Sequence, residues 1–163
     1  MLKVALGVMS AAMALAASGP AMAHGQEITN DLDRCGPRAE GPAVLVDVRG
    51  FAAPTGKVRL QSYHATRGEW LVKGEWLNRI ETGVRAQDGS MRFCVPVPQP
   101  GRYAIAVRHD RDGNGKTDIS RDGGGFSNNP KLSIFNLGKP GVEKAAFNAG
   151  PGVTRITINL QYM

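Results

Sequence analysis

Near its end the chain reads Thr154-Arg155-Ile156-Thr157-Ile158-Asn159-Leu160-Gln161-Tyr162. After the first residue of this stretch, every even-numbered residue is apolar or aromatic, and every odd-numbered residue is polar or charged. Successive side chains of a β-strand point to opposite faces of the sheet, so the alternation predicts a strand with one buried face and one face in water. The residues expected to face the core are Ile156, Ile158, Leu160 and Tyr162.

Four earlier segments alternate in the same way, at residues 43–49, 57–63, 91–97 and 102–109. Pro54-Thr55-Gly56 separates the first two and suggests that they form a hairpin. Several short, half-buried strands joined by turns are typical of an antiparallel β-sandwich, which is the all-β fold that we expect. The apolar residues expected to face inward in these segments are Val44, Val46, Val48, Met91, Phe93, Val95, Val97, Tyr103, Ile105 and Val107.

Three regions lack a clear pattern. Residues 24–42 are polar and rich in Gly and Pro, which indicates an irregular lead-in before a single β-sandwich domain at residues 43–163. Residues 69–80 fit either a hairpin around Gly74 or a short helix. Residues 110–152 predict a long C-terminal loop region, and a loop of that length is typically functional or held in place by other contacts.

The composition favours a turn-rich β protein. With 21 Gly, 10 Pro and 6% aromatic residues among 163, the chain does not resemble a helical bundle or a coiled coil. Two Cys are too few for a disulfide-dense miniprotein. The formal net charge is +6, but Lys and Arg form no run, and aromatic residues do not interleave with them. We therefore expect no nucleic-acid partner.

The first 23 residues have the features of a secretory signal peptide. Lys3 supplies the positive start, an apolar stretch runs over residues 4–17, and Ala21 and Ala23 form the A-x-A pattern of a cleavage site. A transmembrane anchor is the alternative, but the apolar stretch is shorter than the ~20 residues that cross a bilayer. The sequence thus predicts cleavage before His24, no transmembrane segment afterwards, and a periplasmic or secreted protein. Its partner, not identified by the sequence, is expected to be a cell-envelope polymer or protein.

Cys35 and Cys94 are the only cysteines. In an exported chain two cysteines predict one disulfide, which here would tie the N-terminal segment to a later strand. Two free thiols are the alternative. No C-x-x-C or paired Cys/His spacing indicates a redox or zinc site.

An aspartate-rich loop is the sharpest chemical signal. Residues 110–118 match D-x-D-x-N-G-x-x-D, a spacing that lets side-chain oxygens and one backbone carbonyl converge on Ca²⁺. At position twelve of such a loop Arg121 replaces the bidentate Glu, with Asp122 next, so a calcium Kd of ~10⁻⁴ to 10⁻³ M is expected. A tight turn without metal is the alternative, because Asp, Asn and Gly favour turns by themselves. The candidate metal ligands are Asp110, Asp112, Asn114, Lys116 through its carbonyl, and Asp118.

Five stretches of the C-terminal half form a further pattern. They are Pro100-Gly101-Arg102-Tyr103-Ala104-Ile105-Ala106-Val107, His109-Asp110, Asp112-Gly113-Asn114-Gly115-Lys116, Gly125-Phe126-Ser127-Asn128-Asn129 and Ala145-Ala146-Phe147. With these stretches the chain resembles an exported bacterial family known only as domain of unknown function 2141. The resemblance covers about residues 43–163, and the family usually has Asn where Asp112 stands. It implies a transthyretin-like or carboxypeptidase-regulatory-like β-sandwich and export, and it carries no established activity.

Three functions follow as hypotheses. The first is a non-catalytic binding or scaffold module with a structural calcium loop and no catalytic residues. The second is an envelope glycan or peptide binder that uses Trp70 and Trp76, although both tryptophans also fit core or sheet-edge positions. The third is a transthyretin-like hydrolase, for which Ser127 with His109 is a conceivable nucleophile pair. No G-x-S-x-G context supports that pair, and the C-terminal Tyr-Arg-Gly-Ser run of such hydrolases is lacking.

Overall fold

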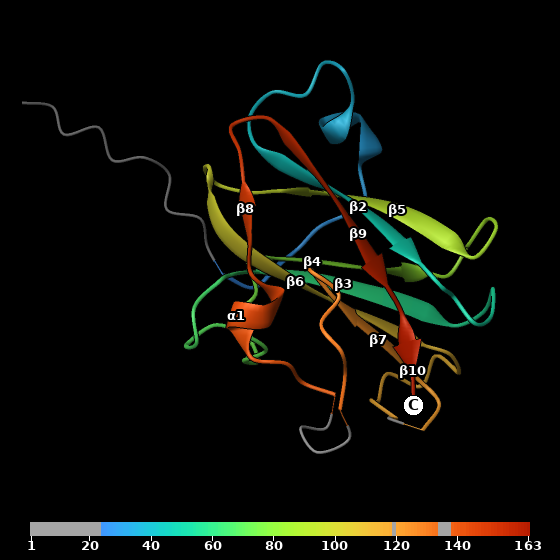
Figure 1. The fold of residues 1–163 in the computed structure, drawn as a ribbon. Helices are drawn as coiled ribbons and strands as arrows, with labels where there is room; N and C mark the ends of the chain where they lie inside the picture. The colour runs from blue at the N-terminus through green and yellow to red at the C-terminus, as the bar shows by residue number, and fades with distance from the viewer. Residues whose placement is uncertain (1–23, 119, 134–137) are drawn as a thin grey trace, which may run out of the picture.

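The computed structural model describes residues 24–118, 120–133 and 138–163 (Figure 1). The predicted signal peptide lies outside these residues and stays a prediction. The described part is almost entirely β, and none of its helices is both long and apolar enough to cross a membrane. Its elements are β1 (Gln26–Glu27), η1 (Leu32–Cys35), β2 (Ala43–Arg49), β3 (Lys57–His64), β4 (Asn78–Gly83), β5 (Ser90–Pro96), β6 (Gly101–Asp110), β7 (Gly123–Phe126), α1 (Val142–Ala145), β8 (Phe147–Ala149), β9 (Val153–Asn159) and β10 (Gln161–Tyr162).

The strands form two mixed sheets. The larger sheet has the order β1-β4-β3-β6-β7-β10, with β8 also paired to β6, and the smaller sheet has the order β5-β2-β9. Most pairs are antiparallel, as expected, but β1 runs parallel to β4 and β2 runs parallel to β9. The expectation of purely antiparallel sheets was therefore wrong. Alternation shows which face of a strand is buried and says nothing about the direction of its neighbour.

The predicted strands are present, but the predicted hairpin is not. Residues 43–49 form β2 with the expected bounds, and residues 57–63 lie within β3. These strands belong to different sheets, so residues 50–56 cross from one sheet to the other instead of reversing within one. A turn signal between two alternating segments fits both connections, because in each case the chain must change direction.

The last predicted strand is divided between the two sheets. β9 pairs with β2 in the smaller sheet, whereas β10 pairs with β7 in the larger one. Leu160 lies between them, and its N–H donates to the Arg49 carbonyl at 2.8 Å. The end of the chain therefore joins the two sheets along one side of the molecule (Figure 1).

The main core lies between the sheets, which are stacked one above the other in Figure 1. Both sheets contribute fully buried side chains, for example Val46 from β2 and Leu60 from β3. Each buried aliphatic side chain of this kind stabilises the fold by roughly 1.5–3 kcal/mol. The even positions of the last stretch also belong to this cluster, with Ile158 and Leu160 buried and Ile156 and Tyr162 packed against it.

The larger sheet carries a second, smaller core on its outer face. Buried residues of β6, β7 and α1 meet there, with Trp70 and Leu71 from the β3–β4 connection packed against them. Residues 110–152, expected to be a long loop region, contain β7, α1 and β8. The triple glycine of β7 hid this strand from the alternation pattern, since glycine has no side chain to alternate. Gly125 lies so close to β9 that a Cβ there would meet Ile158 and the Asn159 carbonyl.

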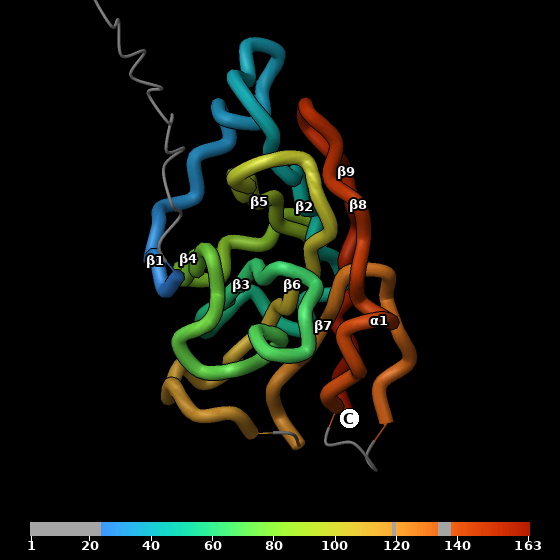
Figure 2. The backbone as a smooth tube through the Cα atoms, turned by 90° about the vertical axis from the view of Figure 1, so that its left-hand side faces the viewer, coloured from blue at the N-terminus to red at the C-terminus, as the bar shows by residue number. Residues whose placement is uncertain are grey.

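The cysteines form the predicted disulfide. Cys35 in η1 is bonded to Cys94 in β5, with an S–S distance of 2.06 Å. β1 also pairs with β4, so residues 24–42 are tied to both sheets rather than trailing from the domain. Figure 2 shows this segment running from β1 along one edge of the molecule toward the start of β2.

Candidate functional site

The aspartate-rich loop, called the aspartate loop below, begins at the end of β6, a central strand of the larger sheet. Asp110 is the last residue of that strand and is buried, with 2% of its surface exposed. Gly56, at the end of the β2–β3 connection, packs on this point with a φ of +84°. A Cβ at Gly56 would collide with the carbonyl oxygens of Asp110 and Arg111. The start of the loop, at the end of β6, therefore packs closely against the residue that precedes β3.

Asp110 accepts two backbone hydrogen bonds that shape the loop. One carboxylate oxygen accepts from the Gly113 N–H and the other from the Gly115 N–H, each at 2.8 Å. Further along, Asp112, Asn114 and Asp118 each accept from the N–H two residues later, at 3.1, 2.6 and 3.1 Å. These are Asx-turn bonds, so the turn chemistry that the sequence offered as an alternative is present in the loop.

Three carboxylates also converge here. The oxygens of Asp110, Asp112 and Asp122 lie within 4.8 Å of one another. Asp122 comes from the far end of the loop, is buried, and accepts from the Asp118 N–H at 2.9 Å. Asp118 is not part of this carboxylate group among the described residues. The sequence motif did not include Asp122, and its position next to Arg121, where a calcium loop has its bidentate Glu, was the signal that could have found it.

The electrostatics of the loop favour the ionised forms of Asp110 and Asp118. Burial by itself would raise the pKa of Asp110, but hydrogen bonds from Gly115 and Gly113 and the charge of Arg108 together lower it. The Arg108 guanidinium lies 3.5 Å from Asp110 and opposes the binding of a cation. Hydrogen bonds from the Ser120 side chain and N–H lower the pKa of Asp118. Carboxylate oxygens are ligands of the kind that Ca²⁺ prefers, and here the positive charge of Arg108 reduces their attraction for the ion.

A cavity of about 240 Å³ opens beside the loop on the outer face of the larger sheet. Its lining is largely apolar and includes Ala106 of β6, Gly124 of β7 and Leu132. Burial raises the pKa of Tyr63, which also lines the cavity, to about 12, with Arg79 and Arg59 opposing that rise. Its hydroxyl therefore stays protonated at neutral pH. We call this cavity the outer-face pocket.

The outer-face pocket and the aspartate loop share residues. Arg108, Thr117 and Asp122 line the pocket, and Asp122 is also one of the three converging carboxylates. The Arg108 guanidinium donates to Thr117 Oγ1 at 2.7 Å and to the Gly115 carbonyl at 3.4 Å. A change in the loop must therefore change one wall of the pocket. Arg59 and Lys139 add two more positive charges to its lining.

The chain was compared with known protein families. A family model described as "Uncharacterized protein conserved in bacteria", domain of unknown function 2141, matches residues 46–157. The chain belongs to this family. No curated protein and no solved structure matches it. The matched residues include β3 to β8 and the whole aspartate loop, so the family region contains the candidate site described above.

In this member of family 2141, His109 is part of the packing. Its ring is fully buried, with Nε2 2.8 Å from the Thr55 carbonyl and Nδ1 2.7 Å from the Tyr162 hydroxyl. A carbonyl only accepts, so Nε2 carries a proton and donates it to the Thr55 carbonyl. The Tyr162 hydroxyl in turn accepts from the Ala52 N–H at 3.1 Å.

Ser127 and its neighbours also hold the backbone of this family member together. The buried Ser127 hydroxyl donates to the Ala145 carbonyl and accepts from the Ile105 N–H, and no hydrogen bond joins it to His109 within the described residues. Asn128 donates to the Ala146 carbonyl. Asn129 donates to the Thr157 carbonyl at 2.9 Å and accepts from the Asn159 N–H at 2.7 Å. These side chains tie the segment after β7 to β9 and to the α1–β8 segment.

The two tryptophans lie in separate environments. Trp70 packs edge-on against Tyr63 and Phe126, and its ring N–H donates to the Pro140 carbonyl at 2.8 Å. Trp76 is covered by the Arg79 guanidinium, 3.6 Å from the ring centre. Both rings therefore pack against other residues of the same chain, as expected for core or sheet-edge residues.

Proposed function

We propose that this protein is an exported, non-catalytic binding module on a transthyretin-like β-sandwich, with a calcium loop that shapes its binding pocket. The observation that carries the proposal is the shared wall of the outer-face pocket and the aspartate loop, where Asp122 belongs to both. Ligand sites in proteins are concave and mainly apolar, with a few polar groups that orient the ligand. The outer-face pocket has this character.

The lining of the pocket indicates the chemistry of its ligand. Three positive side chains, Arg59, Arg108 and Lys139, contribute to it, against one acidic side chain, that of Asp122. Arg59 is neutralised by Glu81 at 2.5 Å, and Arg108 is shared with Asp110, whereas Lys139 is exposed. A small ligand with an apolar body and one negative group therefore fits this pocket better than a cationic one.

Calcium is the second part of the proposal. The sequence spacing of residues 110–118, the ionised state of Asp110 and the convergence of Asp122 support a site for a hard cation. Bound calcium would draw Asp112 toward Asp110 and Asp122 and would hold the pocket wall in one arrangement. The Arg108 charge and the lack of a bidentate Glu argue for weak affinity, as in extracellular calcium sites.

Export and the lack of catalysis are proposed on separate grounds. The Cys35–Cys94 disulfide is typical of oxidising compartments, which agrees with the predicted signal peptide. The two stacked sheets with a common core support the sandwich. His109 and Ser127 both have structural partners, and this favours a binding role over the hydrolase hypothesis.

The binding proposal is tested with 8-anilinonaphthalene-1-sulfonate, an apolar fluorescent anion. The protein is produced from its full sequence, so that any processing takes place, and the probe is titrated while its fluorescence is recorded. We expect saturable binding that is lost in Ala106→Leu, because the larger side chain fills the pocket. Ala52→Leu, at an exposed residue that does not line the pocket, is the matched control and should bind the probe like the wild type.

Two results would overturn the binding proposal. One is the absence of saturable fluorescence in the folded wild-type protein. The other is equal binding by Ala106→Leu and the wild type, which would place the probe elsewhere on the surface. Circular dichroism and the melting temperature of each variant show that the probe reports a folded protein, since this dye also binds partly unfolded states.

A further inference from the structure

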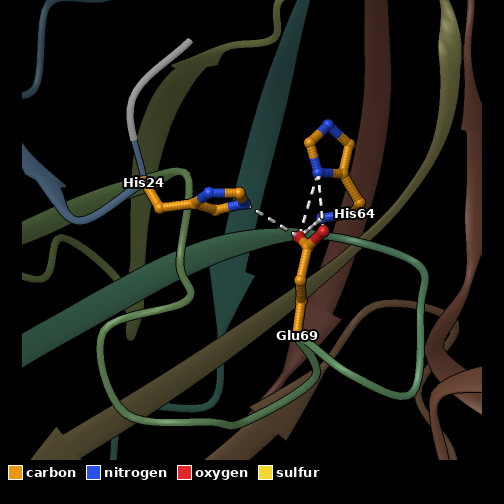
Figure 3. A group of neighbouring side chains, drawn as sticks. All are labelled: His24, His64 and Glu69. Carbon is orange, nitrogen blue, oxygen red and sulfur yellow. Dashed lines mark hydrogen bonds and ion pairs between the residues drawn. The ribbon is translucent and has the colours of Figure 1, made fainter.

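We propose that His24, His64 and Glu69 form a three-ligand site for a divalent transition-metal ion, and that Zn²⁺ is the ion that the site fits. One nitrogen of each imidazole and one oxygen of the carboxylate lie within 4.8 Å of one another. Figure 3 shows both rings directed at the same carboxylate. This site shares no residue with the outer-face pocket or the aspartate loop, so the inference stands apart from the proposed function.

Two of the three distances between the donor atoms are close to those around a zinc ion, and the two imidazole nitrogens lie within 4.8 Å of each other. His24 Nε2 lies 3.4 Å from Glu69 Oε2, and His64 Nδ1 lies 2.9 Å from the same oxygen. Ligands bind Zn²⁺ tetrahedrally at about 2.0–2.2 Å, which places neighbouring donor atoms about 3.3 Å apart. An ion can therefore enter between the three side chains with small movements of their ends.

The backbones at His24 and His64 are held in place by β1, which begins just after His24, and by β3, which ends at His64. Gly25 follows His24, and its N–H donates to the Trp76 carbonyl at 2.6 Å, just before β1 pairs with β4. His64 is the last residue of β3 and stacks on the Tyr103 ring, with centres 5.6 Å apart. Both imidazoles thus start from anchored backbone, although their residues are far apart in the sequence.

Glu69 is oriented by the chain around it. Its carboxylate accepts from the His64 N–H at 3.2 Å, in addition to facing the His64 ring. The next residue, Trp70, is anchored through its ring N–H to the Pro140 carbonyl. A carboxylate that is already aimed by a backbone donor loses less entropy when it binds a metal, and such supporting bonds are typical of metal ligands.

The donor set favours a divalent transition metal. Two imidazole nitrogens and one carboxylate oxygen suit Zn²⁺, and also Cu²⁺ and Fe²⁺, whereas Ca²⁺ and Mg²⁺ prefer oxygen ligands alone. Three protein ligands leave a fourth tetrahedral position open. The His24 and His64 side chains are 40% and 35% exposed, against 19% for Glu69, so the open position is accessible from solvent. Such a site can hold a metal and present it to a molecule from outside.

Hydrogen bonds from two imidazoles to one carboxylate would give the same contacts without a metal, and zinc titration separates the two cases. The protein, produced from its full sequence and treated with chelator, is titrated with Zn²⁺ by calorimetry, with Ca²⁺ and Mg²⁺ as comparison ions. We expect one equivalent of Zn²⁺ and a zinc-dependent rise in melting temperature. Glu69→Gln keeps the shape and an oxygen for the His64 N–H, and His24→Ala changes only the exposed start of the described chain.

Each of these two variants should bind zinc at least about tenfold more weakly, because losing even a supporting partner of a metal ligand costs 10–100-fold. Glu143→Gln is the matched control, since Glu143 is an exposed carboxylate paired with Arg102 away from the site, and it should bind like the wild type. No zinc heat with the wild-type protein would overturn the proposal. Unchanged affinity in both Glu69→Gln and His24→Ala would overturn it as well, by placing zinc elsewhere.

Discussion

Removing the Cys35–Cys94 disulfide is expected to destabilise the protein by about 4 kcal/mol. The bond joins residues 59 apart in the sequence, and closing a loop of that length removes about 14 cal/mol/K of chain entropy from the unfolded state. At 25 °C this corresponds to about 4 kcal/mol, a large share of the 5–15 kcal/mol that typically stabilises a domain. The change should act mainly through the unfolded state, whose entropy rises when the cross-link is removed, because the folded protein already holds the two buried cysteines together.

The assay compares urea unfolding of the oxidised and the reduced wild-type protein by tryptophan fluorescence. Reduction keeps both sulfur atoms, so it removes the cross-link without leaving a cavity. The double variant Cys35→Ala and Cys94→Ala removes both and should lose somewhat more, since the side chains pack with Ala43 in a small buried cluster. A loss below about 1 kcal/mol on reduction would refute the reasoning, because it would mean that the cross-link does not restrict the unfolded chain.

Three further predictions concern the ends of β6 and β10. Tyr162→Phe leaves His109 Nδ1 and the Ala52 N–H without their partner and should cost about 1–3 kcal/mol in urea unfolding. The pKa of Asp110 is lowered in the folded protein, so the ionised Asp110 side chain stabilises the fold. This stabilisation is fully present above the unfolded pKa of about 3.9, and it is lost as the pH falls through the lower pKa of the folded protein. Unfolding midpoints measured between pH 7 and pH 2 should therefore fall more steeply for the wild type than for Asp110→Asn, and equal slopes would contradict this. Gly56→Ala should lower the melting temperature, because φ is +84° there and the new Cβ would collide with the Asp110 carbonyl; an unchanged value would show that the β2–β3 connection can move away.

The strands could be predicted from the sequence, but their partners could not. The alternation at residues 43–49 reflects contact with one buried face, and it gave β2 its bounds. The choice between a hairpin with β3 and a crossing to the other sheet depends on how both sheets pack, which no local pattern reports. β7 was missed for a related reason, since Gly123, Gly124 and Gly125 carry no hydrophobic signal.

The candidate sites also differ in whether the sequence could predict them. The aspartate loop could be found because its ligands follow one another at a fixed spacing. Asp122 was not included, since it reaches the loop only after the chain has turned back at the start of β7. The cluster of His24, His64 and Glu69 has no sequence spacing at all, because β1 and β3 each pair with β4 and so bring distant residues together. The disulfide was predictable because two cysteines leave only one pairing.

The family resemblance carried more information about packing than about chemistry. The Gly-Phe-Ser-Asn-Asn stretch at residues 125–129 is one of the stretches that carry the resemblance. In the structure Ser127, Asn128 and Asn129 bond backbone groups of neighbouring segments. A motif of small polar residues is therefore explained here by the need of backbone groups in neighbouring segments for hydrogen-bond partners.

Calcium titration tests the central claim most directly. The chelator-treated protein is unfolded thermally in 0 to 10 mM Ca²⁺, with Mg²⁺ as the comparison ion, and each variant is compared with its own calcium-free state. With a Kd of ~10⁻⁴ to 10⁻³ M, 10 mM calcium should stabilise the wild type by about 1.4–2.7 kcal/mol. This increment should vanish in Asp110→Ala and Asp112→Ala and remain in Asp33→Ala, an exposed carboxylate in η1. No calcium-specific increment in the wild type, or the same increment in Asp112→Ala, would contradict the account and leave the loop as a set of turns.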